Sequence, residues 1–295
     1  MNLPRNEFRM SITSSCNMKC TYCHNEGNSQ KSILTKENIE KIINAALFTG
    51  IEEVRLTGGD PLVHPQIYEI CDMIHNKYNL RVSINTNCVA FEKLYKMIKN
   101  NLISRVVVGL DYYDAPISKN SLIGISSQEI LNRILIIKNE GCDVSISTVF
   151  NGDYENKKQI IKWCINNGIR VKVLEIERNE ISQTSSADFL KLQKEIIQQF
   201  PFDAVIIDEL NEYNCYINGK RIVSFFPSLC RLRRCDLCKK IQLRITSNGI
   251  LKPCLYYEDQ DEKILDCDNF EISNRIAKTL MRKINYHIDK NLKVN

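Results

Sequence analysis

Short apolar runs recur along the first 176 residues and alternate with longer amphipathic segments. The runs are rich in β-branched residues and have the length of strands, whereas the segments between them repeat apolar residues at helical spacing. One such segment begins at Ser126, which is expected to form a capping box with Glu129, and ends at Gly141. The predicted strands are 8–13, 52–57, 80–85, 104–110, 143–149 and 170–176.

Six strand and helix units in succession predict a parallel sheet with right-handed crossovers, and therefore an α/β fold. The sheet is either doubly wound or curled toward a barrel. Six units are too few to complete an eight-stranded barrel, so a partial barrel would leave a lateral opening for a substrate.

The pattern changes after about residue 200. Segments 215–223 and 243–254 each place Asn-Gly between two β-like arms, which is the strongest short signal for a β-hairpin. We therefore expect a small C-terminal β-hairpin domain that closes over the sheet.

Composition and charge narrow the class of protein. The chain has 295 residues, of which 43% are hydrophobic and 25% charged, as in soluble globular proteins. A net charge of +5 is too mild and too dispersed to predict nucleic-acid binding. No run approaches the roughly 18 apolar residues that a membrane span requires, and residues 1–10 lack the apolar region of a signal peptide. We expect a cytoplasmic protein with no membrane partner.

Thirteen cysteines are many for such a chain, and six of them form two sets. In a reducing cytosol, clustered cysteines favour metal binding over disulfides, and thiolates at this spacing select zinc or iron–sulfur. A structural zinc site wants four ligands, whereas three leave a coordination position free for an outside ligand. The sets are Cys16, Cys20 and Cys23 in C-x3-C-x2-C, and Cys235, Cys238 and Cys254 in C-x2-C-x15-C.

The first set resembles the signature of the radical S-adenosylmethionine (SAM) superfamily, with the aromatic Tyr22 before the third cysteine. The resemblance implies a [4Fe–4S] cluster with one open iron that binds SAM, cleavage of the sulfonium by an electron from the cluster, and abstraction of a hydrogen atom by the resulting 5′-deoxyadenosyl radical. "TGGDPL" looks like the motif that holds the SAM amino group, and "SINTN" looks like the stretch that meets its ribose and carboxylate. The implied SAM-binding residues are Tyr22, Gly58, Gly59, Asp60, Ser83, Asn85, Thr86 and Asn87.

Most of the chain resembles one branch of that superfamily, the GTP 3′,8-cyclase (cyclic pyranopterin monophosphate synthase) family of molybdenum cofactor biosynthesis. "FRMSITSSCNMKCTYC", "VRLTGGDPL", "VVVGLD" and "CDLCKKIQLRITSNGILKPCL" occur in the family's order. The resemblance implies a partial (β/α)6 TIM-like barrel over 1–200 and a C-terminal domain over 201–295. It also implies a lyase with a second [4Fe–4S] cluster on Cys235, Cys238 and Cys254, near which the substrate is held.

The implied substrate residues are the cations Arg9, Lys172 and Arg244, but several positions depart from the family. Lys172 stands where the family has arginine, His64 replaces another arginine, and the chain ends "HIDKNLKVN" without the family's Gly-Gly tail. We therefore expect a paralogue with a different substrate, a small molecule such as a nucleotide. The basic cluster of Lys239, Lys240 and 231–234 either holds an anionic substrate, forms a solvated face, or docks an acidic electron donor such as flavodoxin or ferredoxin.

Three alternatives remain open. Cys230 could complete a zinc ribbon, or it could close the second cluster and make it an electron relay. The enzyme could modify a peptide, since related auxiliary-cluster domains serve peptide maturases. A non-enzymatic iron–sulfur redox sensor or zinc-binding module is a further alternative, although neither would require "TGGDPL" and "SINTN" at strand ends.

Overall fold

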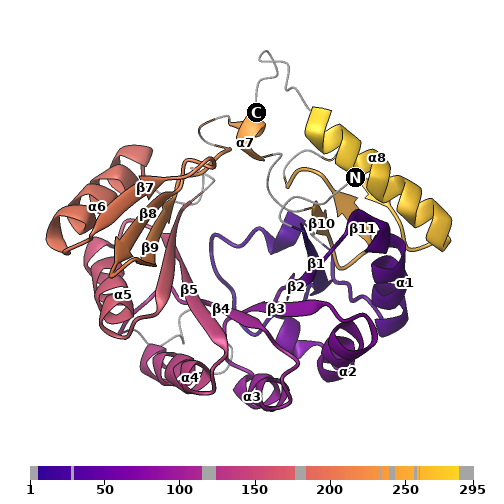
Figure 1. Ribbon diagram of the computed structural model, residues 1–295, viewed down its shortest axis with the longest axis horizontal. Helices are drawn as coiled ribbons and strands as arrows, with labels where there is room; N and C mark the ends of the chain where they lie inside the picture. Colours follow the sequence, from indigo (N-terminus) through magenta and orange to yellow (C-terminus); the bar gives the residue numbers. More distant parts are fainter. Residues whose placement is uncertain are drawn as a thin grey trace. The chain divides into compact units, whose positions relative to one another are not determined.

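The computed structural model describes most of the chain and divides it into two compact units. The first unit comprises 1–15, 24–82 and 233–295, and the second comprises 16–23 and 83–232 (Figure 1). The described residues are 6–27, 30–114, 124–176, 184–230, 232, 234–238, 243–255, 258 and 260–285.

In the first unit, the first strand of the chain lies between strands from distant parts of the sequence. β1 pairs in parallel with β2 on one side and with β10 on the other, and β11 and β12 continue that edge in antiparallel pairs. Helix α1 is capped by Thr35, whose hydroxyl accepts from Asn38 N at 3.2 Å. The elements of this unit are β1 (Glu7–Thr13), α1 (Lys36–Ala46), β2 (Glu53–Gly58), α2 (Ile67–Asp72), α7 (Cys235–Cys238), β10 (Leu243–Ile245), β11 (Ile250–Lys252), β12 (Glu262–Lys263) and α8 (Asn269–Asn285), with short helical turns at Asn25–Gly27, Leu47–Thr49, Pro61–Val63 and Met73–Lys77.

The second unit includes β3 from Ser83 onward and continues the alternation of strands and helices. Its strands run in the order β3, β4, β5, β6, β9, β8, β7; the first five are parallel, and the last two pairings are antiparallel. The elements are β3 (Arg81–Thr86), α3 (Phe91–Lys99), β4 (Arg105–Gly109), α4 (Ser127–Asn139), β5 (Asp143–Phe150), α5 (Tyr154–Asn166), β6 (Arg170–Glu175), α6 (Ser186–Gln199), β7 (Ala204–Ile207), β8 (Tyr213–Ile217) and β9 (Lys220–Phe226).

The predicted strands and hairpins are confirmed. Each of the six strands agrees with its predicted range to within one residue at either end. Ser126 caps α4 by accepting from Glu129 N at 3.1 Å. Asn218 and Gly219 join β8 to β9 with φ of 52° and 70°, the left-handed conformation that a tight hairpin turn requires.

In β1, apolar and polar side chains alternate between the two faces of the strand. In β1, Phe8, Met10 and Ile12 are fully buried, whereas Arg9 lies on the opposite face. Burying each of these large apolar side chains contributes roughly 1.5–3 kcal/mol, so this face anchors the sheet. Candidate site residues such as Arg9 lie on the opposite, polar face.

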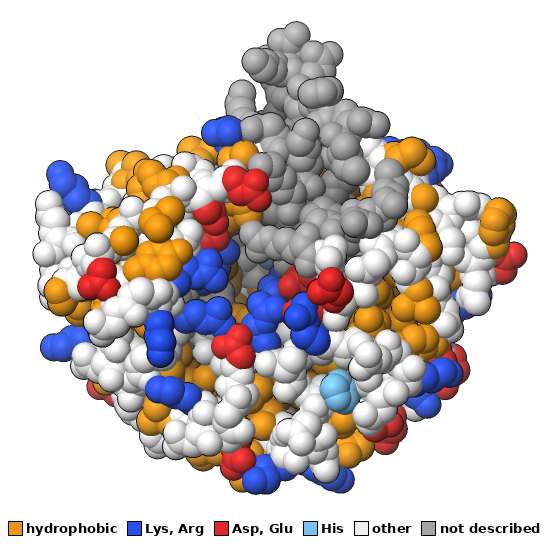
Figure 2. Space-filling view, viewed as in Figure 1, with side chains coloured by type: hydrophobic (Ala, Val, Ile, Leu, Met, Phe, Trp, Pro, Cys, Tyr) orange, Lys and Arg blue, Asp and Glu red, His pale blue; other side chains and the backbone are white. Residues whose placement is uncertain are grey.

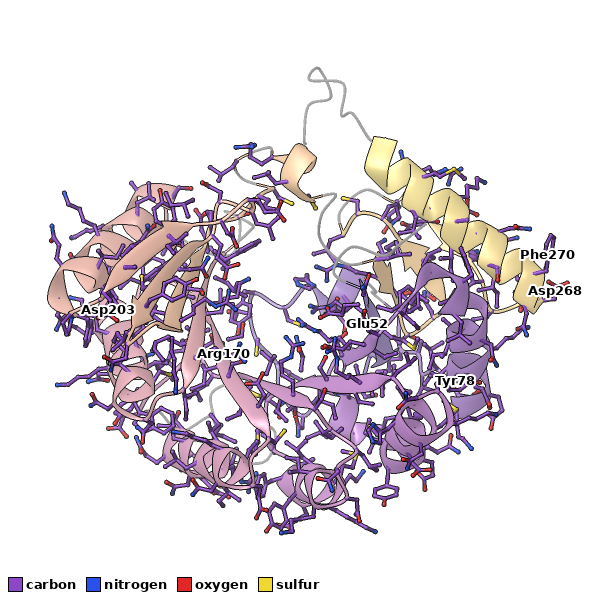
Figure 3. The ribbon with its side chains drawn as sticks, viewed as in Figure 1. Glu52, Tyr78, Arg170, Asp203, Asp268 and Phe270 are labelled. Carbon is purple, nitrogen blue, oxygen red and sulfur yellow. The ribbon has the colours of Figure 1, made fainter. Side chains whose placement is uncertain are left out.

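The last helix of the first unit packs on α1, and Ser273 Oγ donates to Ala45 O at 2.9 Å. At its start, Asp268 and Glu271 cap each other: Asp268 Oδ1 accepts from Glu271 N at 2.8 Å, and Asp268 N donates to Glu271 Oε2 at 3.1 Å. Figure 3 shows Phe270 beside Asp268, pointing away from the helix, and this residue is 74% exposed.

On the face drawn in Figure 2, Lys and Arg side chains are mixed with Asp and Glu side chains. Within the described ranges, no helix is both long and apolar enough to cross a membrane.

Candidate functional site

The turn after β2 lies against the backbone that leads into the first cysteine set. Gly59 N donates to Thr13 O at 2.7 Å, and Asp60 N donates to Ser15 O at 2.9 Å. A Cβ atom on Gly58 would lie 2.2 Å from Thr13 O, and one on Gly59 would lie 2.2 Å from Ser15 O. Only glycine permits this approach, so "GGD" holds the backbone of Thr13 and Ser15, just before Cys16.

Asp60 is buried at the end of this turn. Its Oδ1 accepts from Leu62 N at 2.9 Å and caps the short helix Pro61–Val63. Asp60 therefore has a structural role in addition to the SAM contact predicted for it, and that contact stays a prediction.

The first cysteine set lies on one loop of the second unit, and its three thiols are free of disulfides. Cys16 Sγ accepts from Met18 N at 3.3 Å, and Cys23 N donates to Cys20 O at 3.1 Å. Burial, and then the Asp111 carboxylate, raise the pKa of the Cys20 thiol to about 11. A bound iron would supply the positive charge that releases this proton.

No three Cys, His, Asp or Glu side chains in the described part of the chain gather as ligands of one metal ion. The three cysteines of a cubane bind three different irons, so they need not converge as the ligands of a single ion do. Three partly exposed thiols on one short loop fit the donor set of such a cluster.

Polar groups at the end of β3 differ in how they are used. Ser83 Oγ and Asn85 Oδ1 are buried and have no hydrogen-bond partner within the described residues. Thr86 Oγ1 accepts from Cys88 N at 2.9 Å, and Asn87 Nδ2 donates to Asn17 Oδ1 at 2.5 Å. A buried polar atom without a partner costs stability unless a ligand supplies one, so Ser83 and Asn85 fit a polar cofactor such as SAM.

The two arginines predicted to face the substrate are both paired with one acid. Arg9 and Arg244 lie side by side on β1 and β10, in register. Glu26 Oε2 accepts from Arg9 Nε at 3.2 Å and from Arg244 Nη1 at 2.8 Å, and Glu26 Oε1 forms an ion pair with Arg9 Nη2. Burial alone would raise the pKa of Glu26, but the two guanidinium groups outweigh it and hold that pKa well below its usual range.

Lys172 is paired as well, within the second unit. Its Nζ donates to Glu212 Oε2 at 3.1 Å and lies 4.1 Å from the centroid of the Phe226 ring. Glu212 is buried, whereas the Lys172 side chain is partly exposed. The predicted substrate cations therefore belong to ion pairs, and a substrate anion would have to share or displace the carboxylates.

The second cysteine set is only partly described. α7 spans Cys235–Cys238, and Cys254 follows β11 by two residues. Cys238 and Cys254 are half-buried, and Cys230 is exposed. Lys239, Lys240 and the side chain of Cys235 lie outside the described residues, so a second cluster stays a prediction.

Sequence reasoning missed Glu26, Asp111 and Lys157. Glu26 lies in a polar turn, and neither periodicity nor spacing distinguishes it from a surface acid. Asp111 closes "VVVGLD" at the end of β4, a position where a site residue is common in β/α folds. Lys157 lies on α5 near the charged residues Glu155 and Lys158, so the sequence did not indicate that it is completely buried.

Comparison with known proteins adds a family. The model of the Radical SAM superfamily matches residues 10–171, more than half of the chain. The chain is 26% identical over 273 residues to the probable GTP 3′,8-cyclase of Methanococcus maripaludis, a match covering 89% of this chain and 88% of the relative. It is 24% identical over 293 residues to the GTP 3′,8-cyclase of Aliarcobacter butzleri, covering 94% and 88%.

Solved structures with a similar fold include Streptococcus suis SuiB bound to precursor peptide SuiA, with a TM-score of 0.69 and 16% identity over 97% of this chain and 68% of SuiB. For SuiB bound to S-adenosylmethionine the TM-score is 0.66 and the identity is 18%, over 90% of this chain and 64% of SuiB. The chain therefore spans less than two thirds of that protein. Native anSMEcpe with bound AdoMet and Cp18Cys peptide gives 0.65 and 17%, over 97% and 86%.

These likenesses confirm the expected fold class, an α/β partial barrel whose parallel sheet does not close. The family match covers the first cysteine set, the "GGD" turn and the "SINTN" stretch together. The chain therefore belongs to the radical SAM superfamily.

Proposed function

We propose that this chain is a radical SAM enzyme that takes a hydrogen atom from a small anionic substrate. Cys16, Cys20 and Cys23 would hold a [4Fe–4S] cluster, and Asp60 would bind the SAM ammonium group. When bound, the cluster and SAM would together supply the one-electron reductive cleavage of the sulfonium and the abstraction of the hydrogen atom.

The observation that carries this proposal is the contact of Gly58 and Gly59 with the backbone of Thr13 and Ser15. The contact joins the turn expected to bind SAM to the residues that lead directly into the cysteine loop. Such preorganisation matters because the cofactor must be held in one orientation before it reacts. Ser83 and Asn85 add buried polar groups able to orient it.

A nucleotide is the substrate to test first, because the relatives that match along 88% of their length are named GTP 3′,8-cyclases. Arg9, Arg244 and Lys172 would meet its phosphates, and Cys235, Cys238 and Cys254 would hold a second [4Fe–4S] cluster beside it. Flavodoxin or ferredoxin would supply the electron.

One observation favours a second candidate, a substrate with less negative charge, such as a peptide. Glu26 neutralises one of the two charges of Arg9 and Arg244, so a triphosphate would meet one net positive charge there. The likeness to SuiB bound to SuiA supports only the fold. The charge pattern is thus the specific support for a departure from GTP.

The test uses anaerobically reconstituted protein with SAM and dithionite. The products 5′-deoxyadenosine and any new pterin precursor are followed by mass spectrometry, with and without GTP. The proposal expects 5′-deoxyadenosine in both samples. A nucleotide-derived product that forms only with GTP supports the cyclase reaction. If no such product forms, the less charged substrate is supported. Absence of 5′-deoxyadenosine from protein that contains the cluster would contradict the proposed function.

A further inference from the structure

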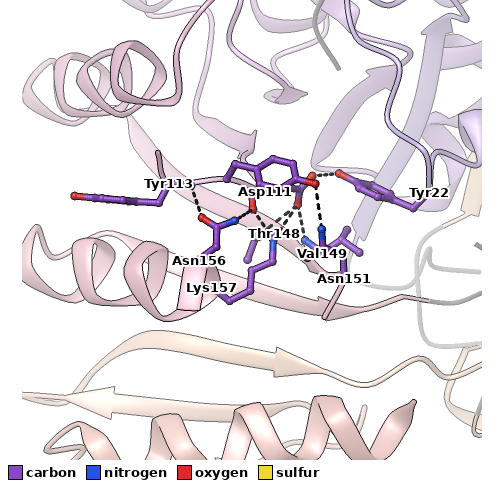
Figure 4. Close-up of polar contacts among 9 residues, drawn as sticks. Tyr22, Asp111, Tyr113, Thr148, Val149, Asn151, Asn156 and Lys157 are labelled. Carbon is purple, nitrogen blue, oxygen red and sulfur yellow. Dashed lines mark hydrogen bonds and ion pairs between the residues drawn. The ribbon is translucent and has the colours of Figure 1, made fainter. Parts of the chain in front are cut away.

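A carboxylate at the end of β4 receives hydrogen bonds from two separate segments of the second unit. Asp111 Oδ1 accepts from Val149 N at 2.8 Å and from Thr148 Oγ1 at 3.3 Å. Asp111 Oδ2 accepts from the Tyr22 hydroxyl (Figure 4).

A buried ammonium group completes this arrangement. Lys157 is fully buried, and its Nζ donates to Asp111 O at 2.7 Å and to Thr148 Oγ1 at 2.9 Å. The same Nζ lies 3.7 Å from Asp111 Oδ1. A buried charge is tolerated only when it is paired and hydrogen-bonded, so Lys157 and Asp111 depend on each other.

The backbone around Asp111 is fixed from the same helix. Asn156 Nδ2 donates to Asp111 O at 2.8 Å, while Asn156 Oδ1 accepts from Tyr113 N at 2.6 Å. Figure 4 shows Asn156 and Lys157 approaching Asp111 from one side and Tyr22 from the other. The carboxylate is therefore held in place independently of Tyr22.

Tyr22 lies between Cys20 and Cys23, so its hydroxyl bond ties the cysteine loop to β4. The other end of the loop is tied through Asn87, whose Nδ2 contacts Cys16 Sγ at 3.7 Å and Asn17 Oδ1 at 2.5 Å. A bare carboxylate beside thiolate ligands would repel them, and a nearby cation offsets that repulsion.

We propose that Asp111 and Lys157 form a charge-compensated anchor for the three-cysteine loop. Asp111 holds Tyr22, and Lys157 neutralises Asp111, so an anion can lie beside a cluster whose ligands are themselves anionic. Both are positioning residues that act on the loop through Tyr22. The inference rests on the cluster of the proposed function.

The decisive readout is the midpoint potential of the reconstituted cluster, measured by redox titration with electron paramagnetic resonance. Lys157→Met leaves an uncompensated carboxylate and shifts the potential to more negative values, because negative charge disfavours adding an electron. Asp111→Asn removes the negative charge that Tyr22 contacts and shifts the potential to more positive values. Lys158→Met is the matched control, since Lys158 is the next residue of α5 and its ion pairs among the described residues, with Glu155 and Glu195, lie at the surface. The cluster of this variant keeps the parental potential.

A second measurement uses a variant that removes a single oxygen atom. Tyr22→Phe is expected to release iron to a chelator about 10-fold faster than the parent, since a hydrogen bond to a charged group is lost. Circular dichroism and the melting temperature check that each variant is folded. If Lys157→Met does not fold, the iron release from Tyr22→Phe tests the anchor.

Opposite shifts of potential and faster iron release support the anchor. Shifts in the same direction, unchanged potentials, or parental iron release from Tyr22→Phe would overturn it. A parent chain that takes up a cluster while no variant changes it overturns the anchor alone. A parent chain that takes up none overturns the proposed function and the anchor together.

Discussion

Glu26→Gln tests whether one acid holds the two arginines of β1 and β10. The side chains of Glu26, Arg9 and Arg244 are only 8%, 17% and 21% exposed. Removing one partner of a buried ion pair costs about 3–5 kcal/mol. Because water still reaches both guanidinium groups, we expect the variant to lose about 2–3 kcal/mol of unfolding free energy.

The assay is urea unfolding at neutral pH, followed by circular dichroism, with the midpoint and slope reported separately. The matched control is Glu52→Gln, because Glu52 pairs with Arg81 at 3.4 Å and both side chains are 58% exposed. An exposed pair contributes at most about 1 kcal/mol, so this variant should lie close to the parent. Equal losses in the two variants would refute the reasoning.

The same pair predicts a pH dependence. The pKa of Glu26 is depressed in the folded state below its ordinary value of 4.5, so the unfolded chain binds the proton more readily. The stabilisation is therefore fully present above about pH 5 and is lost as the pH falls through 4.5 toward the folded value. The difference in unfolding free energy between parent and Glu26→Gln should shrink over that range, and a constant difference would contradict the assignment.

Three further predictions concern the cofactors. Asp60→Ala should weaken SAM binding by about 10- to 150-fold in calorimetry without loss of iron, because a charge-assisted contact is removed; unchanged affinity would exclude that contact. Gly59→Ala should lower the melting temperature and SAM affinity together, since its Cβ would lie 2.2 Å from a backbone oxygen, and a parental variant would show that the turn can adapt. Replacing Cys235, Cys238 and Cys254 by Ala should halve the iron content but leave slow 5′-deoxyadenosine formation with dithionite, whereas unchanged iron would remove the second cluster.

Local patterns predicted much of the fold. β-branched runs located the six parallel strands, because strands buried on one face need alternating apolar residues. Asn218 and Gly219 located a hairpin, since few other residue pairs accept its backbone conformation. β7 and α8 were missed: β7 has four exposed residues and thus no inward apolar pattern, and α8 is strongly polar outside the stripe that packs on α1.

The site divides in the same way. Cysteine spacing and "GGD" are short, local motifs, so they could be found in the sequence. Glu26 and Arg244 are 218 positions apart, and their contact beside Arg9 depends on β10 lying beside β1. The burial of Lys157 likewise depends on α5 covering the ends of β4 and β5, which no local pattern encodes. These contacts depend on the packing of distant segments, so sequence patterns alone could not predict them.

The measurement that tests the central claim most directly is 5′-deoxyadenosine formation by the parent chain and by a variant with Cys16, Cys20 and Cys23 all changed to Ala. Both are reconstituted anaerobically, checked for folding by circular dichroism, and incubated with SAM and dithionite. We predict that the parent forms 5′-deoxyadenosine and that the folded variant forms none, because no other site would pass an electron to the sulfonium. Equal yields from the two proteins, or none from a parent carrying its cluster, would contradict the account.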